Sequence, residues 1–288
     1  MIKTRKLAGA DVFPIGLGAM PMSLSGRPPE EQSIRAIHAA LDAGVNLIDT
    51  ADAYSADESD VGHNERLIAK ALAGRREGVI VATKGGHTRT AGGDWEVDGS
   101  REHLRAACEA SLTALGTDRI DLYQYHRPDP SVPYAESIGA LKELQDEGKV
   151  RWIGVSNADA DQIEEALAIA DIVSVQNQLS LEYTAPISGG EVELCTERGI
   201  AFLPWSPLGG ISVAAGAAGA HDPVQEIADA HGVSPQRVAL AWLLALSPVV
   251  IPIPGASRPE SIQDSLQAVE LELSHEELQA IGRIAQAA

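Results

Sequence analysis

Short apolar runs alternate with amphipathic segments along most of the chain, and this alternation is the strongest pattern in the sequence. The runs are mostly continuous rather than interleaved with polar residues, which is typical of parallel strands that are covered on both faces. They predict eight strands, over Phe13–Leu17, Val45–Ile48, Val79–Ala82, Ile120–Tyr125, Trp152–Val155, Ile172–Val175, Ile200–Leu203 and Val249–Ile253.

The segments between these runs carry the start and stop signals of helices. Pro28-Pro29-Glu30 precedes apolar residues at helical spacing and Gly44 follows them, which predicts one helix. Ser234-Pro235 begins another. Three pairs have the spacing of a capping box, in which a Ser or Asp precedes a Glu or Gln by three positions. They are Asp159 with Gln162, Ser257 with Glu260, and Ser274 with Glu277.

Strand–helix alternation without a linker fits either a barrel or a large doubly wound sheet. A doubly wound dinucleotide-binding fold predicts Gly-x-Gly-x-x-Gly after its first strand. Residues 16–21 read Gly-Leu-Gly-Ala-Met-Pro and break that pattern at the third glycine. We therefore predict an α/β fold, a (β/α)₈ TIM barrel that forms one domain over residues 1–288. A short N-terminal β-hairpin around Lys6–Val12 is expected to close the barrel floor.

Composition narrows the range of partners. The 22 basic and 41 acidic residues give a formal charge of −19, and a surface this acidic repels nucleic acid and anionic lipid. Cys108 and Cys195 belong to no Cys-x-x-Cys or Cys/His cluster, so neither zinc nor dithiol chemistry has support. The sequence shows no signal peptide and no apolar run long enough to span a membrane. We expect a cytoplasmic protein without a metal site, a nucleic-acid partner or a membrane partner.

The predicted strands end in polar residues, and in a barrel the active site lies at the carboxyl ends of the strands. Asp49 ends the second strand, with Tyr54 on the following loop, while Lys84 ends the third and His126 the fourth. Each of these residues alone has a structural explanation, such as a turn cap or a satisfied imidazole. Their convergence on one face of the barrel indicates chemistry instead. The later strands end in Ser156-Asn157, Gln176, Pro204–Pro207 and Pro254-Gly255.

The combination of these four side chains is suited to protonating a carbonyl oxygen. A free tyrosine, with a pKa of about 10, is too weak an acid to donate efficiently near neutral pH. A lysine ammonium about 4 Å away favours the phenolate by roughly 4 kcal/mol at an effective dielectric near 20. We therefore expect Lys84 to lower the pKa of Tyr54, Asp49 to keep Lys84 charged, and His126 to polarise the carbonyl. This site supplies a proton but no electrons, so a reducing cofactor is required.

The spacing and surroundings of these residues resemble the catalytic tetrad of the aldo-keto reductases. Asp49 lies five residues before Tyr54, Val-Ala-Thr precedes Lys84, and Tyr-Gln-Tyr precedes His126. Further segments resemble, in order, the second helix, fifth strand, seventh strand and cofactor loop of that family. They are Gly62–Glu65 with Leu67–Leu72, Ile153–Asn157, Trp205–Gly209, and Ile253–Glu260.

The resemblance implies an NADP(H)-dependent aldo-keto reductase that acts on an aldehyde or ketone, commonly as a monomer. Tyr54 is then the general acid, tuned by Lys84 and Asp49, and His126 orients the substrate. An arginine beside a helix start also suits a phosphate, which favours NADPH over NADH. The implied cofactor contacts are Ser156, Asn157 and Gln176 at the carboxamide, Trp205 stacked on the nicotinamide, Ser206, Leu208 and Gly209 near the pyrophosphate, Gly255 in the cofactor loop, Ser257 and Arg258 at the 2′-phosphate, and Gln263 near the adenine.

Two features depart from the family pattern. Gln263 and Ser265 stand where family members commonly have Glu and Asn, which changes the expected contacts with the adenine. Residues 210–221 form a short loop rich in Ala and Gly, and the chain ends soon after its last predicted helix. We therefore expect an open pocket. Met20, Trp95 and Arg127 are candidates for its lining, and plain surface or rim roles are favoured for these three.

Three other functions were weighed against a reductase. A cofactor-sensing binding module on the same barrel can keep all four residues, and it stays open as the alternative. A metal-dependent lyase or isomerase needs clustered ligands, and only Asp49 and His126 are candidates. A short-chain dehydrogenase requires Tyr-x-x-x-Lys, whereas Tyr54 and Lys84 are thirty residues apart.

Overall fold

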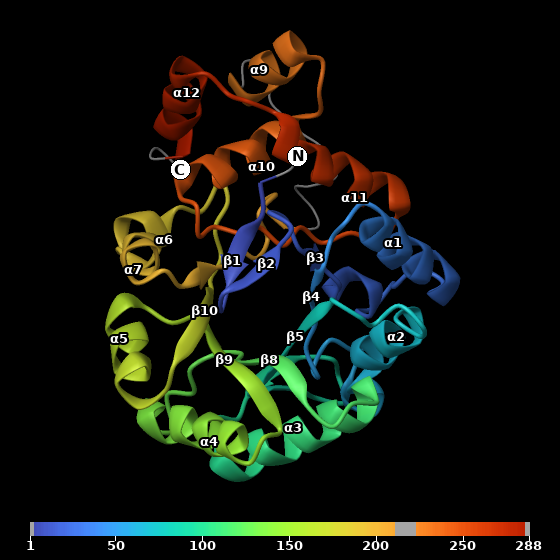
Figure 1. Cartoon of the computed structure of the whole chain (residues 1–288). Coiled ribbons are helices and arrows are strands. Elements are labelled where there is room, and N and C mark those ends of the chain that lie inside the picture. The colour runs from blue at the N-terminus through green and yellow to red at the C-terminus, as the bar shows by residue number, and fades with distance from the viewer. Residues whose placement is uncertain (1–2, 211–222, 286–288) are drawn as a thin grey trace.

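A computed structural model describes residues 3–210 and 223–285. Seven strands form one parallel sheet that curls into a barrel, in the order β11-β10-β9-β8-β5-β4-β3, and helices surround it (Figure 1). This architecture confirms the predicted (β/α)₈ barrel. The strands are β3 (Leu17–Gly18), β4 (Leu47–Asp49), β5 (Ile80–Gly85), β8 (Ile120–Tyr125), β9 (Val150–Ser156), β10 (Ile172–Gln176) and β11 (Ala201–Phe202).

The helices that follow the strands pack their apolar faces on the outside of the barrel. They are α1 (Glu30–Asp42), α2 (His63–Ala71), α3 (Arg101–Leu115), α4 (Tyr134–Asp146), α5 (Ala160–Ile169), α6 (Ala185–Ser188), α7 (Glu191–Arg198), α9 (Pro223–His231), α10 (Pro235–Leu246), α11 (Pro259–Leu266) and α12 (His275–Ala285), with short 3₁₀ turns at Met20–Met22, Glu58–Asp60 and Gln267–Glu270. Cys108 on α3 and Cys195 on α7 are buried and free, and burial raises the pKa of each thiol to about 12.

Two of the three predicted capping boxes are present. Asp159 and Gln162 exchange hydrogen bonds at the start of α5, and Ser274 and Glu277 do the same before α12. The third prediction, Ser257 with Glu260, is wrong. Arg258 is the N-cap of α11 and Pro259 is its first residue, so the helix begins one position later than the pattern indicated.

Prolines explain why the first and last predicted strands are shorter than their apolar runs. Pro14 lacks an N–H, and the Phe13 N–H donates to the side chain of Asn46, so regular pairing begins only at Leu17. The run Val249–Ile253 is not a regular strand, yet it closes the barrel. Ile251 and Ile253 donate to Phe202 and Pro204 on one side. On the other side the carbonyls of Pro252 and Pro254 accept from Gly16 and Gly18.

The two prolines accept hydrogen bonds from β3 but cannot donate to it. The return hydrogen bond comes from beyond them, where the N–H of Ala256 donates to the carbonyl of Gly18 at 3.3 Å. The backbones also approach closely. A Cβ atom on Gly18 would lie 2.7 Å from the carbonyl oxygen of Ile253, so glycine is required at this position.

The N-terminal hairpin lies across one end of the barrel, as predicted (Figure 1). Strands β1 (Arg5–Leu7) and β2 (Ala10–Val12) pair antiparallel around a turn in which Ala8 and Gly9 have positive φ. Leu7 and Val12 are fully buried and pack against the apolar residues inside the barrel. That inner cluster contains Leu47, Ile80, Ala82, Leu122, Ala201, Leu203 and Ile251.

The inward-facing positions change from apolar to polar along each strand. Because successive side chains in a strand alternate between two faces, residues two apart share the barrel interior. Leu47 is therefore followed by Asp49, Ala82 by Lys84, and Leu122 by Gln124. The polar layer lies at the carboxyl ends of the strands, away from the hairpin.

None of the helices in the described ranges is long and apolar enough to cross a membrane. The loop 210–221 that was expected to be short and open lies outside the described residues, apart from Gly210.

Candidate active site

Lys84 is the central residue of the polar layer, and its side chain is fully buried. Its Nζ donates to Oδ2 of Asp49 at 2.8 Å, to the carbonyl of Thr50 at 2.7 Å and to the hydroxyl oxygen of Tyr54 at 3.0 Å. An ammonium group has three hydrogens, so each has an acceptor. The parallel pairing of β4 with β5 produces this arrangement, since it places Asp49 beside the strand that carries Lys84.

Asp49 and Lys84 form a buried ion pair. Burial raises the pKa of the Asp49 carboxyl group, and the charge and hydrogen bond of Lys84 oppose that change. Oδ2 of Asp49 accepts from Lys84, and Oδ1 accepts from Nε2 of Gln176 at 2.7 Å, so both carboxylate oxygens are acceptors. Burial lowers the pKa of Lys84, but the nearby Asp49 charge and the two side-chain acceptors outweigh it and raise that pKa above 10.5. Lys84 therefore stays charged at neutral pH, as expected from the sequence.

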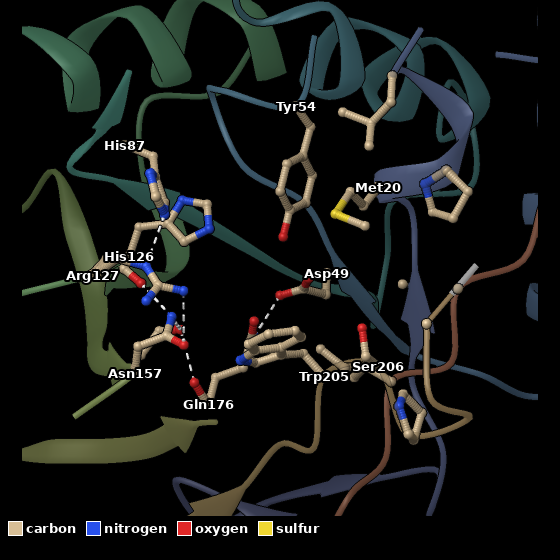
Figure 2. A pocket seen from close by; sticks show the side chains of 18 of the residues that line it. Met20, Asp49, Tyr54, His87, His126, Arg127, Asn157, Gln176, Trp205 and Ser206 are labelled. Atoms are coloured by element: carbon tan, nitrogen blue, oxygen red, sulfur yellow. Dashed lines mark hydrogen bonds between the residues drawn. The ribbon is translucent and has the colours of Figure 1, made fainter. Parts of the chain in front are cut away.

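Tyr54 retains its proton. Burial raises the pKa of its hydroxyl above the usual 10, and the Lys84 charge opposes this change without reversing it. Lys84 acts on this pKa in the expected direction and lowers it, but the net pKa is raised because the loss of hydration outweighs the attraction of the ammonium. The Tyr54 oxygen already accepts from Lys84, so its own hydrogen is directed elsewhere. Figure 2 shows this hydroxyl pointing into the pocket.

His126 lies beside Tyr54 at the end of β8, with the two ring centroids 5.7 Å apart. Burial, followed by the nearby charge of Lys84, lowers the pKa of this imidazole well below 6.5, so the ring is neutral. Its Nδ1 atom is buried without a partner among the described residues. An unpaired donor costs more than an unpaired acceptor in a protein interior. We therefore assign the proton to Nε2, which leaves a donor available to the pocket.

A second imidazole, His87, adjoins His126 and was not identified from the sequence. It lies on β6 (His87–Arg89), which pairs with β7 (Trp95–Val97) in a hairpin between β5 and α3. The His87 and His126 centroids are 4.3 Å apart and their planes are nearly perpendicular. The available signal was its position three residues after Lys84, but the hairpin strands are too short to produce a periodic pattern.

These side chains line a cavity of about 510 Å³ at the carboxyl ends of the strands. Met20, Trp95 and Arg127 contribute to the lining, where the sequence had favoured surface or rim roles and offered the lining only as an alternative. Figure 2 shows His87, His126, Arg127 and Asn157 grouped on one wall. The full lining is Gly18, Met20, Pro21, Leu24, Asp49, Tyr54, His87, Trp95, His126, Arg127, Ser156, Asn157, Gln176, Trp205, Ser206, Pro207, Leu208, Gly210, Ile253 and Gly255.

Three of the expected cofactor ligands form a linked group on this wall. Ser156 donates its hydroxyl hydrogen to the carbonyl of Gln176 at 2.7 Å. The side-chain nitrogen of Asn157 donates to Ser156 at 3.0 Å and to the carbonyl of His126 at 2.9 Å. Because Nε2 of Gln176 donates to Asp49, its Oε1 is the atom left to contact a ligand. The three side chains are therefore positioned before any cofactor binds.

Trp205, Ser206, Leu208 and Gly255 also line the cavity. The indole Nε1 of Trp205 is buried without a partner in the described part of the chain, which is unusual for a buried donor. The other four expected cofactor residues, Gly209, Ser257, Arg258 and Gln263, are not part of the lining. Arg258 is exposed at the N-cap of α11, and Gln263 is exposed in the middle of this helix. Ser265 is buried, and its hydroxyl donates to the carbonyl of Ser261.

Two of the expected cofactor residues have a strained backbone. Asn157 has a φ of 58° and Ser206 a φ of 48°, the left-handed region that non-glycine residues rarely adopt. The third non-glycine residue with positive φ among those described is Ala8, in the hairpin turn. Such strain clusters at functional sites because the surrounding structure fixes the side chain where it is needed.

The chain is similar in sequence to a known enzyme family. The family model described as the Aldo/keto reductase family matches residues 14–286. Probable aldo-keto reductase 1 of Glycine max is 35% identical over 301 residues, which cover 95% of this chain and 85% of the relative. An uncharacterized oxidoreductase of Schizosaccharomyces pombe is also 35% identical, over 95% of this chain and 87% of its own.

Solved structures show the same similarity along the whole chain. An aldo-keto reductase from Bacillus halodurans, in its holo form, has a TM-score of 0.82 and 30% identity, and the match covers 100% of this chain and 98% of that one. An aldo/keto reductase from Klebsiella pneumoniae, in complex with NADP and acetate, has a TM-score of 0.81 and 27% identity, with 99% and 95% covered.

Proposed function

The chain belongs to the aldo-keto reductase family, and we propose that it reduces an aldehyde or ketone to an alcohol with NADPH as cofactor. Family membership makes the protein an oxidoreductase, as its sequence indicated. One observation carries the proposal for the site. All three hydrogens of the buried Lys84 ammonium have acceptors, which leaves the proton of Tyr54 directed into the cavity.

In this proposal Tyr54 is the general acid. When bound, NADPH supplies the hydride, and the carbonyl oxygen must gain a proton as negative charge develops on it. Tyr54 holds that proton at neutral pH because burial keeps its pKa high. As the proton leaves, the phenolate oxygen stays 3.0 Å from the Lys84 ammonium, which stabilises the new charge. Asp49 keeps Lys84 charged and in place.

His126 orients the carbonyl in the same proposal. Its neutral ring offers Nε2–H as a second donor to the carbonyl oxygen, from the wall beside Tyr54. A neutral imidazole donates a hydrogen bond without releasing its proton. The proton therefore comes from Tyr54, and His126 fixes the direction from which the oxygen approaches.

The cavity fits the nicotinamide end of the cofactor. Ser156, Asn157 and Gln176 present polar atoms on one wall, and the unpaired Trp205 indole lies in the same lining. We propose that these residues hold the carboxamide and the ring. The remaining proposed contacts follow the family pattern: Ser206, Leu208, Gly209 and Gly255 near the pyrophosphate, Ser257 and Arg258 at the 2′-phosphate, and Gln263 near the adenine.

The comparisons support NADP(H) as the cofactor. Two structures of an aldo-keto reductase from Klebsiella pneumoniae contain NADP and NADPH. The cofactor-sensing binding module has no support, since the relatives described above are named as reductases or as an oxidoreductase. A cytoplasmic location, a monomeric state, one domain over residues 1–288 and the lack of nucleic-acid or membrane partners remain predictions from the sequence.

The test is NADPH consumption with a reactive aromatic aldehyde, measured for the wild type and for Tyr54→Phe. We expect kcat/KM to fall by about 10²–10⁴ in the variant, because the proton donor is lost. The Kd for NADPH should stay within about twofold, because Tyr54 contacts the substrate side of the cavity. An NADH control should show slower turnover. Unchanged turnover in Tyr54→Phe would remove Tyr54 as the acid, and NADPH binding without reduction of any carbonyl in a broad panel would reject the reductase.

A further inference from the structure

One side chain in the cavity lining carries a charge that no other described residue neutralises. Asp49 and Arg127 are the charged members of the described lining, and Asp49 is paired with Lys84. Arg127, which directly follows His126, is exposed and forms no ion pair with a carboxylate in the described ranges.

The partners of Arg127 are both neutral. Its Nε lies 3.2 Å from Nε2 of His87, and its Nη2 donates to Oδ1 of Asn157 at 3.2 Å. Nδ1 of His87 lies 2.9 Å from the carbonyl of Glu96. A carbonyl only accepts, so Nδ1 of His87 carries the proton and Nε2 accepts from Arg127. His87 is therefore neutral and adds no competing charge.

These two hydrogen bonds occupy the edge of the guanidinium formed by Nε and Nη2. The Nη1 atom has no partner among the described residues. They also hold the group in a fixed orientation beside the two imidazoles (Figure 2). A guanidinium held in this way is arranged to bind a carboxylate, because its planar donors match the two carboxylate oxygens.

We propose that Arg127 recognises a carboxylate on the substrate, so that the preferred substrates are carbonyl compounds with an anionic group several bonds from the reacting carbonyl. This inference rests on the proposed reductase function. The negative surface of the protein repels anions at long range, so such substrates are selected by a contact inside the cavity. The apolar side chains of the lining, which include Met20 and Trp95, accommodate the carbon frame between the two polar ends.

Recognition of a carboxylate by Arg127 can be distinguished from a purely structural role of this side chain. Arg127 also holds Asn157, and losing that contact would weaken the reduction of every substrate equally. Recognition of a carboxylate changes the preference between two substrates that differ only in charge. The readout is therefore a ratio of two kcat/KM values.

The experiment compares 4-carboxybenzaldehyde with methyl 4-formylbenzoate, which has the same ring and a neutral ester in place of the carboxylate. For the wild type we expect kcat/KM to be about ten- to a hundredfold higher for the carboxylate, mainly through a lower KM, as for a charge-assisted hydrogen bond. In Arg127→Gln this ratio should fall to about one, and the loss of the contact with Asn157 should lower kcat/KM for both substrates by one common factor, which cancels in the ratio. Arg127→Lys, which keeps the charge but not the planar donors, should fall between the two.

Arg151 provides the matched control. It is exposed and lies over the ring of Trp152 near the start of β9, at the opposite end of the barrel. Arg151→Gln removes the same charge and should leave the ratio unchanged. A wild-type ratio near one, or a ratio that survives in Arg127→Gln, overturns the inference, as does an equal loss for both substrates. If the wild type reduces neither aldehyde nor any neutral carbonyl, the reductase proposal itself has failed.

Discussion

The two ends of the barrel interior use the same strands but different side chains. Toward the hairpin, Leu47, Ala82 and Leu122 pack with Leu7 and Val12 in a layer without polar groups. Two residues further along the same strands stand Asp49, Lys84 and Gln124, which are equally buried. The first layer is stabilised by the burial of apolar surface. The second loses hydration and depends on each polar atom finding a partner.

The polar layer is nearly but not fully satisfied, and its exceptions indicate function. The Nε2 atom of Gln124, Nδ1 of His126 and Nε1 of Trp205 are buried without partners in the part of the chain that the structure describes. Left-handed backbone occurs at Asn157 and Ser206 beside the same cavity. One end of the barrel therefore stabilises the fold, while the other is held in a costly arrangement that is useful only when a ligand binds.

The largest effect is expected from Lys84→Met, which removes the charge at the centre of the polar layer. Asp49 is then buried without its counter-ion, which costs about 3–5 kcal/mol of unfolding free energy. The ammonium that stabilises the phenolate is also lost, so kcat/KM should fall by at least about 10². Urea unfolding and NADPH consumption measure the two effects. Asp49→Leu combined with Lys84→Met should recover stability without activity, and a double variant as unstable as the single one contradicts this account.

Leu122→Ala tests the apolar layer on the strand that ends in His126. We expect a loss of about 2–5 kcal/mol in unfolding free energy, because the substitution leaves a cavity inside the barrel. Since Leu122 does not line the pocket, kcat/KM at a temperature where the variant is folded should stay within about twofold. If Leu122→Ala lost as much activity as Lys84→Met, the apolar layer and the polar layer of the barrel would not be functionally separate.

The same contrast explains what the sequence could predict. Each apolar run predicted a strand, and the first polar residue after the run marked the carboxyl end of that strand. In this way the sequence predicted Asp49, Lys84 and His126 at strand ends. Those residues and Tyr54 lie together as expected. His87 was missed because a three-residue strand has no period to recognise. The seam at residues 249–254 was placed correctly, although its two prolines prevent a regular ladder.

The sign of the Tyr54 pKa shift could not be predicted from the sequence. The expectation counted the attraction of Lys84, which depends on a separation that motif spacing suggests. The opposing loss of hydration was expected in kind, but its size depends on every residue packed around the hydroxyl and could not be obtained from the sequence. The capping box at Ser257 failed for a similar reason, since a Ser-x-x-Glu pattern does not show which residue the backbone uses as its cap.

An intermediate effect is expected on the pH dependence of stability. The pKa of His126 is depressed well below 6.5 by burial, so below pH 6.5 the unfolded chain binds a proton that the folded protein does not. Stability therefore falls as the pH drops from 6.5 toward the folded pKa, by up to about 1.4 kcal/mol per pH unit. His126→Gln should remove this part of the slope. The measurement is urea unfolding of both proteins at several values between pH 5 and 7.

The contribution of His126 is the difference between the wild type and His126→Gln in the slope of unfolding free energy with pH. Burial raises the pKa of the Asp52 and Glu65 carboxyl groups, and these groups act in the opposite direction, with stability lost as the pH rises through their folded pKa. His87, whose pKa burial also lowers, adds to the same slope as His126 in both proteins. Equal slopes for the wild type and His126→Gln would mean that the pKa of this imidazole is the same in the folded and the unfolded protein, which contradicts its depression by burial.

The smallest effect is expected from relieving backbone strain at Ser206. Its φ of 48° is costly for serine and free of steric cost for glycine. Glycine also gains freedom in the unfolded chain, which offsets part of the benefit. We therefore expect Ser206→Gly to raise the unfolding free energy by at most about 1 kcal/mol. It should weaken NADPH binding by about three- to tenfold, since the side chain lines the cavity and the loop becomes less fixed.

Ala8→Gly is the matched control at the other end of the barrel. Ala8 has a φ of 49° in the hairpin turn, so the same strain is relieved far from the cavity. Both substitutions should raise the melting temperature by a similar small amount, while only Ser206→Gly weakens NADPH binding in a fluorescence titration. If Ser206→Gly is stabilised and binds NADPH as tightly as the wild type, the strain at Ser206 serves no purpose in binding. The positive φ of Ser206 would then serve only to form a turn of the backbone, as the positive φ of Ala8 does.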